Sequence, residues 1–223
     1  MVADTASTPA PPTNFDALTH LLSKGSTLHR VHHSKRSADT FNPGRGTPTR
    51  FAPIVTAAGS AAGPSTAHVS VPTLYAAQSA EAALCETILH DVPLTGGSLA
   101  LGAYAAYIES SLELQRDLRL AKLMGDGLRR LGITPQELTA TNGDVYDRTV
   151  LWAQAAHTAG FDGVAWMSAW DNTAAAYVLF GDRVTPTDVA ITSEGIGQFT
   201  PGTSGFRWLS GYCARVGVEL LIA

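Results

Sequence analysis

Residues 71–91 read VPTLYAAQSAEAALCETILHD and predict a short strand that runs directly into a helix. The strand ends at Tyr75, and the helix that follows buries an apolar face around Leu84 and Ile88. At about 100° per residue, Glu86 falls at the edge of that face rather than opposite it. A carboxylate there loses hydration unless a cation or a hydrogen-bond donor meets it. Glu86 therefore has two readings, a structural ion pair or a carboxylate held ready for chemistry.

The composition of the whole chain restricts its class. It has 223 residues, 45% of them hydrophobic, and a formal net charge of −4. This length suits one well-cored domain with a tail. The negative charge argues against direct nucleic acid binding, which depends on Lys and Arg. No apolar run approaches the roughly 20 residues that span a bilayer, and no secretory signal is visible. Cys85 and Cys213 suggest no disulfide framework, so a cytoplasmic location is expected.

The N-terminal part of the chain divides into a tail and the start of a domain. Residues 1–14 are small, polar and proline-rich, which predicts a disordered tail, with one domain over 15–223. Within that domain, residues 15–23 are compatible with a short helix and residues 27–33 with a first strand. Two loops are then expected, over 34–54, which carries four cations, and over 55–70, which is rich in glycine and alanine.

After the opening segment, helical and strand patterns alternate. Helices are predicted where apolar residues recur at helical spacing or a cap is visible: 121–133, 134–138 behind Thr134-Pro135, and 147–160 ending at Gly160. Strands are predicted over 98–110, where helix is the alternative, and over 161–168, 174–181 and 216–223. This mixture predicts an α/β or α+β fold, and the pattern alone leaves that choice open.

Common catalytic and ligand-binding motifs are absent from the sequence. It contains no Gly-rich phosphate loop, HExxH, CxxC or GxSxG. His32 and His33 are adjacent in a predicted strand, so their side chains point to opposite faces and are poorly placed to share a metal. What remains is a set of polar residues at or near the ends of apolar elements: Arg30, Arg50, Tyr75, Glu86 and Ser168.

Each of these residues has a structural and a functional reading. Arg30 and Arg50 are surface or ion-paired residues, or forks that bind a phosphate bidentately. Tyr75 is a core aromatic whose hydroxyl reaches solvent, or a ring that stacks on a flat ligand. Ser168 caps a following turn or lines a site at the end of its strand.

Taken together, these residues and their surroundings resemble the RES domain family, which is named after an Arg, a Glu and a Ser. The resemblance covers about residues 26–220 and is carried by LHRV with Arg30, NPGRG…TRFAP with Arg50, PTLYAAQSAEAALCETILHD with Tyr75 and Glu86, and GFDGVAWMSAWD with Ser168. It implies a fold similar to ADP-ribosyltransferase toxins, a compact α/β core with a split, mainly antiparallel sheet around an NAD cleft.

The resemblance also implies a function. RES proteins cleave NAD⁺ by phosphorolysis or hydrolysis, with NAD as substrate and neither a prosthetic group nor a metal. Many are toxins that a cognate Xre-type helix-turn-helix antitoxin neutralises. Two alternatives are kept, a mono-ADP-ribosyltransferase that modifies a protein and an inactive RES-like binding module.

Matched by motif, the family implies roles for the five residues. Arg30 and Arg50 would grip the NAD phosphates, Tyr75 would line the nicotinamide end, Glu86 would be the catalytic carboxylate, and Ser168 would be the serine of the family name. Catalysis is thus expected to involve Arg30, Tyr75, Glu86 and Ser168, and NAD binding to involve Arg30, Arg50 and Tyr75.

Three features depart from the family pattern. Phe51 replaces the commoner Trp after Arg50, and the loop over 55–70 is longer than usual. The polar contribution from the helix before the Asp-Gly strand is also open, with Asp147, Arg148 and Thr149 as candidates.

Overall fold

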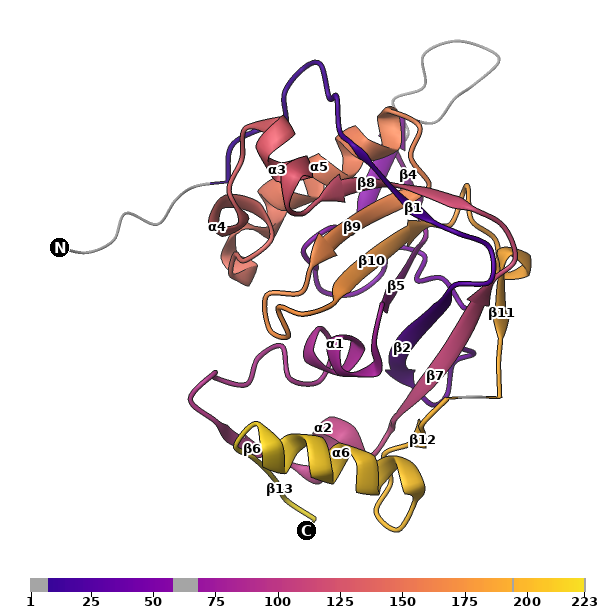
Figure 1. Cartoon of the computed structure of the whole chain (residues 1–223), viewed down its shortest axis with the longest axis vertical. Helices are drawn as coiled ribbons and strands as arrows, with labels where there is room; N and C mark the ends of the chain where they lie inside the picture. The colour runs from indigo at the N-terminus through magenta and orange to yellow at the C-terminus, as the bar shows by residue number, and fades with distance from the viewer. Residues whose placement is uncertain (1–7, 58–67, 194, 223) are drawn as a thin grey trace, which may run out of the picture.

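The structure is a computed structural model that describes residues 8–57, 68–193 and 195–222. In this part of the chain, nine strands form one large sheet, in which the β8–β9 pair is parallel and the other pairs are antiparallel (Figure 1). In spatial order the strands are β1 (Thr19–Leu22), β8 (Leu118–Leu123), β9 (Gly163–Met167), β10 (Ala175–Phe180), β5 (Thr73–Ala77), β2 (Thr27–His33), β7 (Tyr107–Leu114) and β11 (Val189–Ile191), and β12 (Gly197–Gln198) also pairs with β7.

Helices cover the two ends of this sheet (Figure 1). Beside β8 and β9 lie α3 (Asp126–Leu131), α4 (Pro135–Leu138), the short turn η1 (Gly143–Val145) and α5 (Tyr146–Thr158). At the opposite end lie α2 (Leu101–Tyr104), α6 (Ser204–Arg215) and a two-stranded parallel sheet of β6 (Gly97–Leu99) and β13 (Val218–Leu220). Between the two ends, α1 (Ala80–Cys85) follows directly on β5. The remaining elements are η2 (Pro186–Asp188) and the hairpin of β3 (Ile54–Ala57) and β4 (His68–Val71).

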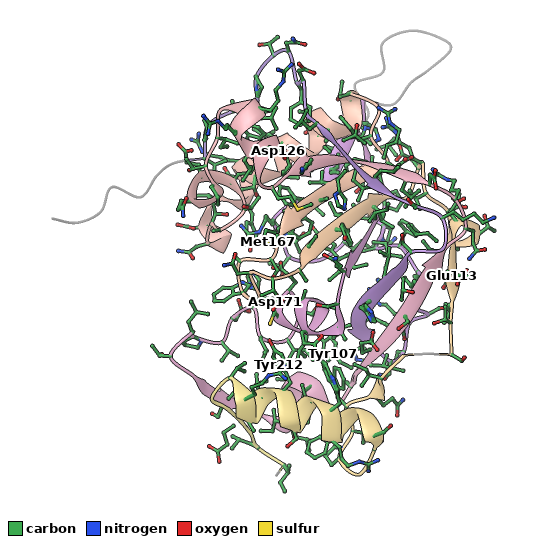
Figure 2. The ribbon with its side chains drawn as sticks, viewed as in Figure 1. Tyr107, Glu113, Asp126, Met167, Asp171 and Tyr212 are labelled. Carbon is green, nitrogen blue, oxygen red and sulfur yellow. The ribbon has the colours of Figure 1, made fainter. Side chains whose placement is uncertain are left out.

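Side-chain patterning explains which faces are buried. On β7, Leu112 and Leu114 are buried and Glu113 between them is exposed, the period of two expected of a strand with one covered face (Figure 2). On α5, Trp152 and Ala156 lie one helical turn apart, and both are buried in a core that also contains residues of β9. The central strand β10 is buried along its whole length, which fits its apolar sequence AAYVLF.

The large sheet is split between β2 and β5. These neighbours pair through one register, His29 with Ala77, and beyond His29 the strand β2 continues alongside β7. If the antiparallel ladder continued, Arg30 would lie opposite Ala76. Instead, the two strands part there and leave space between them.

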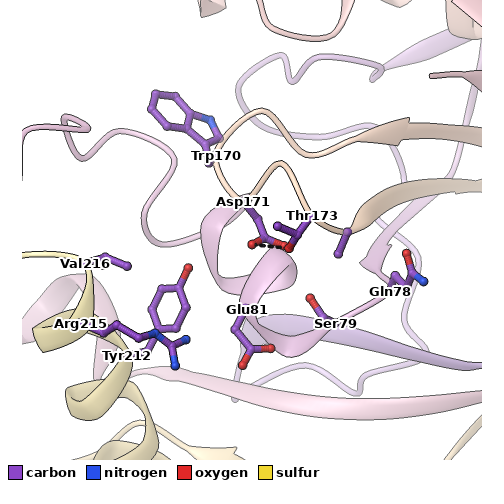
Figure 3. Close-up of a pocket in the computed structure, with 10 residues that line it drawn as sticks. Gln78, Ser79, Glu81, Trp170, Asp171, Thr173, Tyr212, Arg215 and Val216 are labelled. Carbon is purple, nitrogen blue, oxygen red and sulfur yellow. Dashed lines mark hydrogen bonds between the residues drawn. The ribbon is translucent and has the colours of Figure 1, made fainter. Parts of the chain in front are cut away.

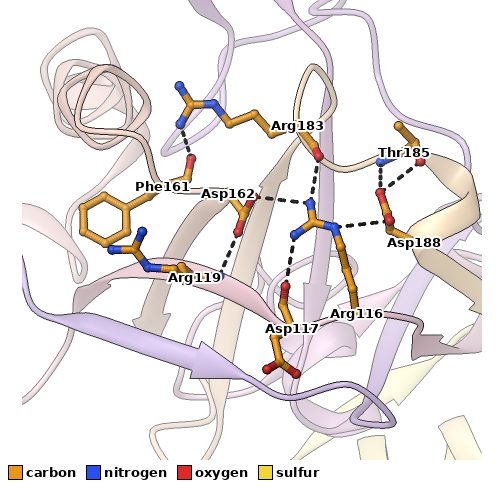
Figure 4. A network of polar contacts seen from close by, with 8 residues as sticks. All are labelled: Arg116, Asp117, Arg119, Phe161, Asp162, Arg183, Thr185 and Asp188. Carbon is orange, nitrogen blue, oxygen red and sulfur yellow. Dashed lines mark hydrogen bonds and ion pairs between the residues drawn. The ribbon is translucent and has the colours of Figure 1, made fainter.

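A network of polar contacts lies where β7 turns into β8, near the start of β9 and the end of β10 (Figure 4). Arg116, in the turn between β7 and β8, contacts Asp162 Oδ1 at 3.3 Å and Asp188 Oδ1 at 3.2 Å. Its guanidinium also donates to the carbonyl oxygens of Asp117 at 3.0 Å and Arg183 at 2.8 Å. One side chain therefore ties together the starts and ends of several strands.

The fold class and most elements predicted from the pattern are confirmed. The molecule is a mixed α/β fold around a mainly antiparallel sheet, and the strands over 27–33, 161–168 and 174–181 are β2, β9 and β10. The helix over 147–160 is α5, and Gly160 follows it at φ 89°. Residues 134–138 contain α4 with its capping box, and residues 98–110 contain both strand and helix.

One predicted helix is wrong and two are shorter than predicted. Residues 15–23 contain strand β1 instead of a helix, because that segment pairs with β8. The first residues of the predicted helix over 121–133 complete β8. The helix α3 begins only after Gly125, whose φ of 54° separates the strand from the helix. The opening helix is also shorter than predicted, since α1 ends at Cys85 although Ile88 remains buried.

The predicted tail and the second loop are described only in part. Residues 1–7 and 58–67 lie outside the described residues, and the ends of the 55–70 loop are strands β3 and β4. Thr8 is buried, and the carbonyl of Pro9 accepts a 2.8 Å hydrogen bond from Trp152 Nε1. This end of the predicted disordered tail is therefore packed on the domain. Among the described residues, no helix is long and apolar enough to cross a membrane.

Candidate functional site

A cavity of about 850 Å³ opens at the split between β2 and β5. Both strands border it, through residues 30–33 of β2 and Thr73, Tyr75 and Ala76 of β5. The end of α1 and the loop over 34–50 close other sides. Four of the five predicted site residues line this one cavity: Arg30, Arg50, Tyr75 and Glu86.

The Arg30 guanidinium is held by the loop that follows β2. Its Nη1 donates to the carbonyl oxygen of Ala38 at 2.6 Å and to that of Thr40 at 2.9 Å. Burial lowers the pKa of Arg30 to about 10, with Asp39 opposing the shift and Arg36 adding to it. The group is therefore still a cation at neutral pH. Among the described residues both hydrogen bonds use Nη1, so the N–H groups on Nε and Nη2 remain for a ligand.

Arg50 is more deeply anchored, with an exposed fraction of 4%. Its Nη1 donates to Thr141 Oγ1 at 2.6 Å, and its guanidinium carbon lies 5.3 Å from the centroid of the Tyr146 ring. A planar cation stacked on an aromatic ring and bonded at one nitrogen has a fixed orientation. Arg50 is thus presented to the cavity as a rigid charge.

The three candidates on α5 differ in their relation to this site. Asp147 and Arg148 are exposed, whereas Thr149 is fully buried. The Thr149 hydroxyl donates to the backbone carbonyl of Arg50. Of the three, Thr149 is therefore the residue that contacts the site segment, and it acts on the position of Arg50.

Tyr75, on β5, contacts the segment that carries Arg50. Its hydroxyl lies 2.9 Å from Thr49 Oγ1 and accepts a 3.1 Å hydrogen bond from the backbone N–H of Phe51. Burial raises the pKa of Tyr75 well above its ordinary value, so the phenol stays protonated. Its ring meets Trp166 edge to face with centroids 5.9 Å apart. Both rings line the cavity and together form an aromatic wall.

Two polar atoms at this cavity have no protein partner. Among the described residues, Glu86 Oε1 and Trp166 Nε1 are buried and make no hydrogen bond. An orphaned buried acceptor or donor costs about 1–3 kcal/mol, so such groups call for an explanation. Both atoms belong to residues that line the cavity, so a carboxylate acceptor and an indole donor without protein partners lie at its wall.

Ser168 is placed differently from the other four. It is fully buried at the end of β9 and is not among the lining residues of this cavity. Its Oγ accepts a 3.2 Å hydrogen bond from the backbone N–H of Asp171, and its carbonyl accepts one from Asn172. This is the turn-capping arrangement that the sequence left open. Ser168 shapes the turn beside the site.

His90 and Tyr146 belong to the site but were not singled out by the sequence. His90 Nε2 lies 2.9 Å from the Tyr146 hydroxyl, and both residues line the cavity. Burial raises the pKa of Tyr146, the charge of Arg50 opposes that shift, and the charge of Glu86 adds to it. The ring of Tyr146 therefore lies within the fields of both charged residues. The one sequence signal for His90 is its position four residues after Glu86.

A second cavity, of about 630 Å³, borders the start of α1 (Figure 3). Its lining includes Glu81, Asp171, Tyr212 and Arg215, and none of the five predicted residues lines it. It is smaller, and the cations predicted to bind phosphate lie elsewhere. The cavity at the split is therefore the better candidate site.

Comparisons with known proteins agree with this geometry. A family model described as the RES domain matches residues 27–196, and no curated protein matches the chain. Among solved structures, the M. tuberculosis MbcT–MbcA toxin–antitoxin complex contains a similar fold, with a TM-score of 0.54 and 16% sequence identity. That match covers 85% of this chain and 90% of the other.

Proposed function

The chain belongs to the RES domain family, and from that membership we propose that it cleaves the bond between nicotinamide and ribose in NAD⁺. The main support for this proposal is that one cavity is lined by four residues that lie far apart in the sequence: Arg30, Arg50, Tyr75 and Glu86. Phosphate-binding cations, an aromatic wall and a carboxylate are the parts that this reaction needs.

In the proposed reaction, each of these residues has a distinct role. The C1′–N1 bond breaks, its electron pair leaves with nicotinamide, and positive charge develops on the anomeric carbon. Glu86 stabilises that charge and holds the ribose hydroxyls, as carboxylates do in glycoside cleavage generally. Arg30 and Arg50 hold the pyrophosphate by charge-assisted hydrogen bonds. The acceptor oxygen bonds to C1′ and, when water is the acceptor, releases a proton.

The two buried polar atoms without hydrogen-bond partners also support the proposal, because leaving them unpaired costs free energy. Among the described residues, neither Trp166 Nε1 nor Glu86 Oε1 has a hydrogen-bond partner. A nicotinamide riboside offers a carbonyl acceptor and hydroxyl donors, which are the groups that an indole N–H and a carboxylate bind. This matches a binding site better than a purely structural ion pair at Glu86.

The direct test is to incubate the purified chain with NAD⁺, with and without phosphate, and to identify the products by mass. We expect free nicotinamide together with ADP-ribose or its 1″-phosphate, and a roughly 10²-fold or larger loss of turnover in Glu86→Gln and Arg30→Ala. NAD⁺ left intact under both conditions would overturn the proposal. Label appearing on a macromolecule would instead identify the chain as a protein ADP-ribosyltransferase.

We further propose that the chain acts as a toxin that a helix-turn-helix antitoxin of the Xre type neutralises. The support is family membership together with the fold shared with a toxin of a toxin–antitoxin complex. Induced expression of the wild-type chain should deplete cellular NAD⁺ and stop growth, while Glu86→Gln should leave both unchanged. Growth arrest by Glu86→Gln as strong as that by wild type would separate toxicity from NAD⁺ cleavage.

A further inference from the structure

Two cations at the site have no assigned task. Lys35 and Arg36 follow β2 in a turn and line the same cavity as Arg30. Both are exposed, and in the part of the chain that the structure describes neither side chain forms an ion pair or a hydrogen bond. They are therefore available to a ligand that occupies the cavity.

The turn that carries them is fixed by its own backbone contacts. The N–H of Lys35 donates to His33 Nδ1 at 3.2 Å, and the N–H of Arg36 donates to the carbonyl of His33 at 3.0 Å. His33 in turn packs near Tyr107 of β7, with ring centroids 5.8 Å apart. The base of each long side chain is thus positioned relative to the sheet, and only the side chains have to adjust to bind.

The charges that line the cavity are unevenly distributed. Its formal cations are Arg30, Lys35, Arg36 and Arg50, and its carboxylates are Glu86 and Asp91. Three of the four cations come from residues 30–36, while both carboxylates belong to α1 or the turn after it. Like charges gathered in one segment repel one another, so an anion bound there is favoured.

The proposed substrate does not use all of this charge. Each phosphate of a dinucleotide's pyrophosphate carries one negative charge, and Arg30 and Arg50 match these two. A third phosphate, as a monoester with a charge of about −1.5 to −2 at pH 7, would match Lys35 and Arg36. In dinucleotides that additional phosphate is the 2′-phosphate of NADP, which cationic side chains recognise.

We propose that Lys35 and Arg36 bind the adenosine 2′-phosphate of NADP⁺, so that the cavity takes the phosphorylated dinucleotide in preference to NAD⁺. This inference rests on the proposed function for the placing of the dinucleotide. It can fail separately, because it concerns binding of a phosphate and not cleavage of the glycosidic bond.

The test measures binding of products that the chain does not consume. Calorimetry of the full chain with ADP-ribose and with 2′-phospho-ADP-ribose, at low ionic strength, should show roughly tenfold tighter binding of the phosphorylated ligand, the scale of one charge-assisted hydrogen bond. Lys35→Ala/Arg36→Ala should reduce this preference to about one, with a smaller effect on ADP-ribose. Added salt should weaken the preference in wild type.

A matched variant controls for net charge. Lys24 and Arg45 are exposed cations outside the cavity lining, so Lys24→Ala/Arg45→Ala removes the same charge from other positions. This control should keep the tenfold preference. Equal affinity of wild type for the two ligands, or a preference that survives Lys35→Ala/Arg36→Ala, would overturn the inference.

Cleavage assays with NAD⁺ and NADP⁺ separate the two proposals. If the chain prefers the 2′-phosphorylated product but cleaves neither dinucleotide, the phosphate site stands and the proposed function fails. If it cleaves NAD⁺ and shows no preference in binding, the proposed function stands and the phosphate site fails.

Discussion

Glu86 is the C-cap residue of α1, and its carboxylate oxygen Oε1 is buried and without a hydrogen-bond partner among the described residues. The sequence left it open whether this carboxylate belongs to a structural ion pair or to a functional site. Within the described residues no ion pair with Glu86 is present, which favours the functional reading. A residue that a site requires but the fold does not should be replaceable without loss of stability.

Glu86→Gln tests that reading through stability. The amide keeps the size of the side chain and removes a partly buried charge, so the free energy of unfolding should stay within about 0.5 kcal/mol of wild type or rise. Urea unfolding followed by circular dichroism measures this. A loss of more than about 2 kcal/mol would instead indicate that Glu86 is paired in the folded state.

His32 provides a pH dependence at the same cavity. Burial lowers the pKa of His32, and the charge of Arg30 lowers it further. Its Nε2 lies 3.0 Å from Ser110 Oγ. The unfolded chain takes up a proton near the ordinary value of 6.5, whereas the folded imidazole stays neutral to lower pH. The contribution of the neutral His32 imidazole to stability is therefore fully present above pH 6.5 and is lost as the pH falls toward the lower pKa of the folded state.

His32→Gln should reduce this loss. Glutamine keeps a polar group near Ser110 but does not titrate. Between pH 7.5 and 5.5, the free energy of unfolding measured in urea should fall less in His32→Gln than in wild type. His20, whose pKa burial and Lys122 also lower, should supply part of the dependence that remains. Identical pH dependence in the two proteins would contradict the assignment.

At the scale of single elements, α1 depends on its first residue. Ser79 Oγ accepts a 3.1 Å hydrogen bond from the N–H of Ala82, and the helix has fewer than two turns to bring Glu86 into place. Ser79→Ala should lower the free energy of unfolding by about 0.5–2 kcal/mol, whereas Ser79→Asp should keep the cap. Urea unfolding of the three proteins decides this, and equal stability of Ser79→Ala and wild type would show that the cap is dispensable.

Elements with strong local signals were predicted correctly from sequence. The helix α5 has helical spacing and a C-terminal glycine, and α4 has a proline behind its capping threonine. The segment over 15–23 failed because its strand state depends on pairing with β8, a contact about 100 residues away in the chain. The helix α6 was not predicted because glycine and serine interrupt its apolar spacing, although Leu209 and Cys213 are buried one turn apart.

The site was predictable to the extent that its residues lie in recognisable motifs. Arg30, Arg50, Tyr75 and Glu86 reach one cavity, as the resemblance implied, but no local pattern reveals that a sheet splits between β2 and β5. Tyr146 and His90 could not be identified as site residues from the sequence, because they meet only when α5 packs beside the turn after α1. Ser168 was ambiguous in sequence because a serine after a strand can cap a turn or line a site.

At the scale of the whole molecule, the split that makes the cavity has to be held open by contacts elsewhere. The single register between β2 and β5 gives the two halves of the sheet little direct pairing. The Arg116 network joins the turn after β7 to the start of β9 and to the chain that follows β10 (Figure 4). It therefore bridges the half that contains β7 and the half that contains β9 and β10.

Arg116→Met should show how much this bridge contributes. The change keeps apolar length but leaves the partly buried carboxylates of Asp162 and Asp188 without their cation. The pKa of Asp188 is lowered overall, because the opposing effect of burial is outweighed by hydrogen bonds from Thr185 and the charge of Arg116. We expect the free energy of unfolding to fall by about 1–3 kcal/mol, the scale of lost hydrogen bonds to charged groups.

Arg119→Met serves as the matched control. Arg119 lies nearby on β8, and its guanidinium carbon lies 5.8 Å from the centroid of the Phe161 ring. Among the described residues this guanidinium makes no hydrogen bond or ion pair, so its loss should cost less than about 1 kcal/mol. Arg116→Lys should recover only part of the lost stability, since an ammonium cannot bridge two carboxylates and two carbonyls with a planar fork. Equal stability of Arg116→Met and Arg119→Met would show that packing between the halves, rather than this network, maintains the split.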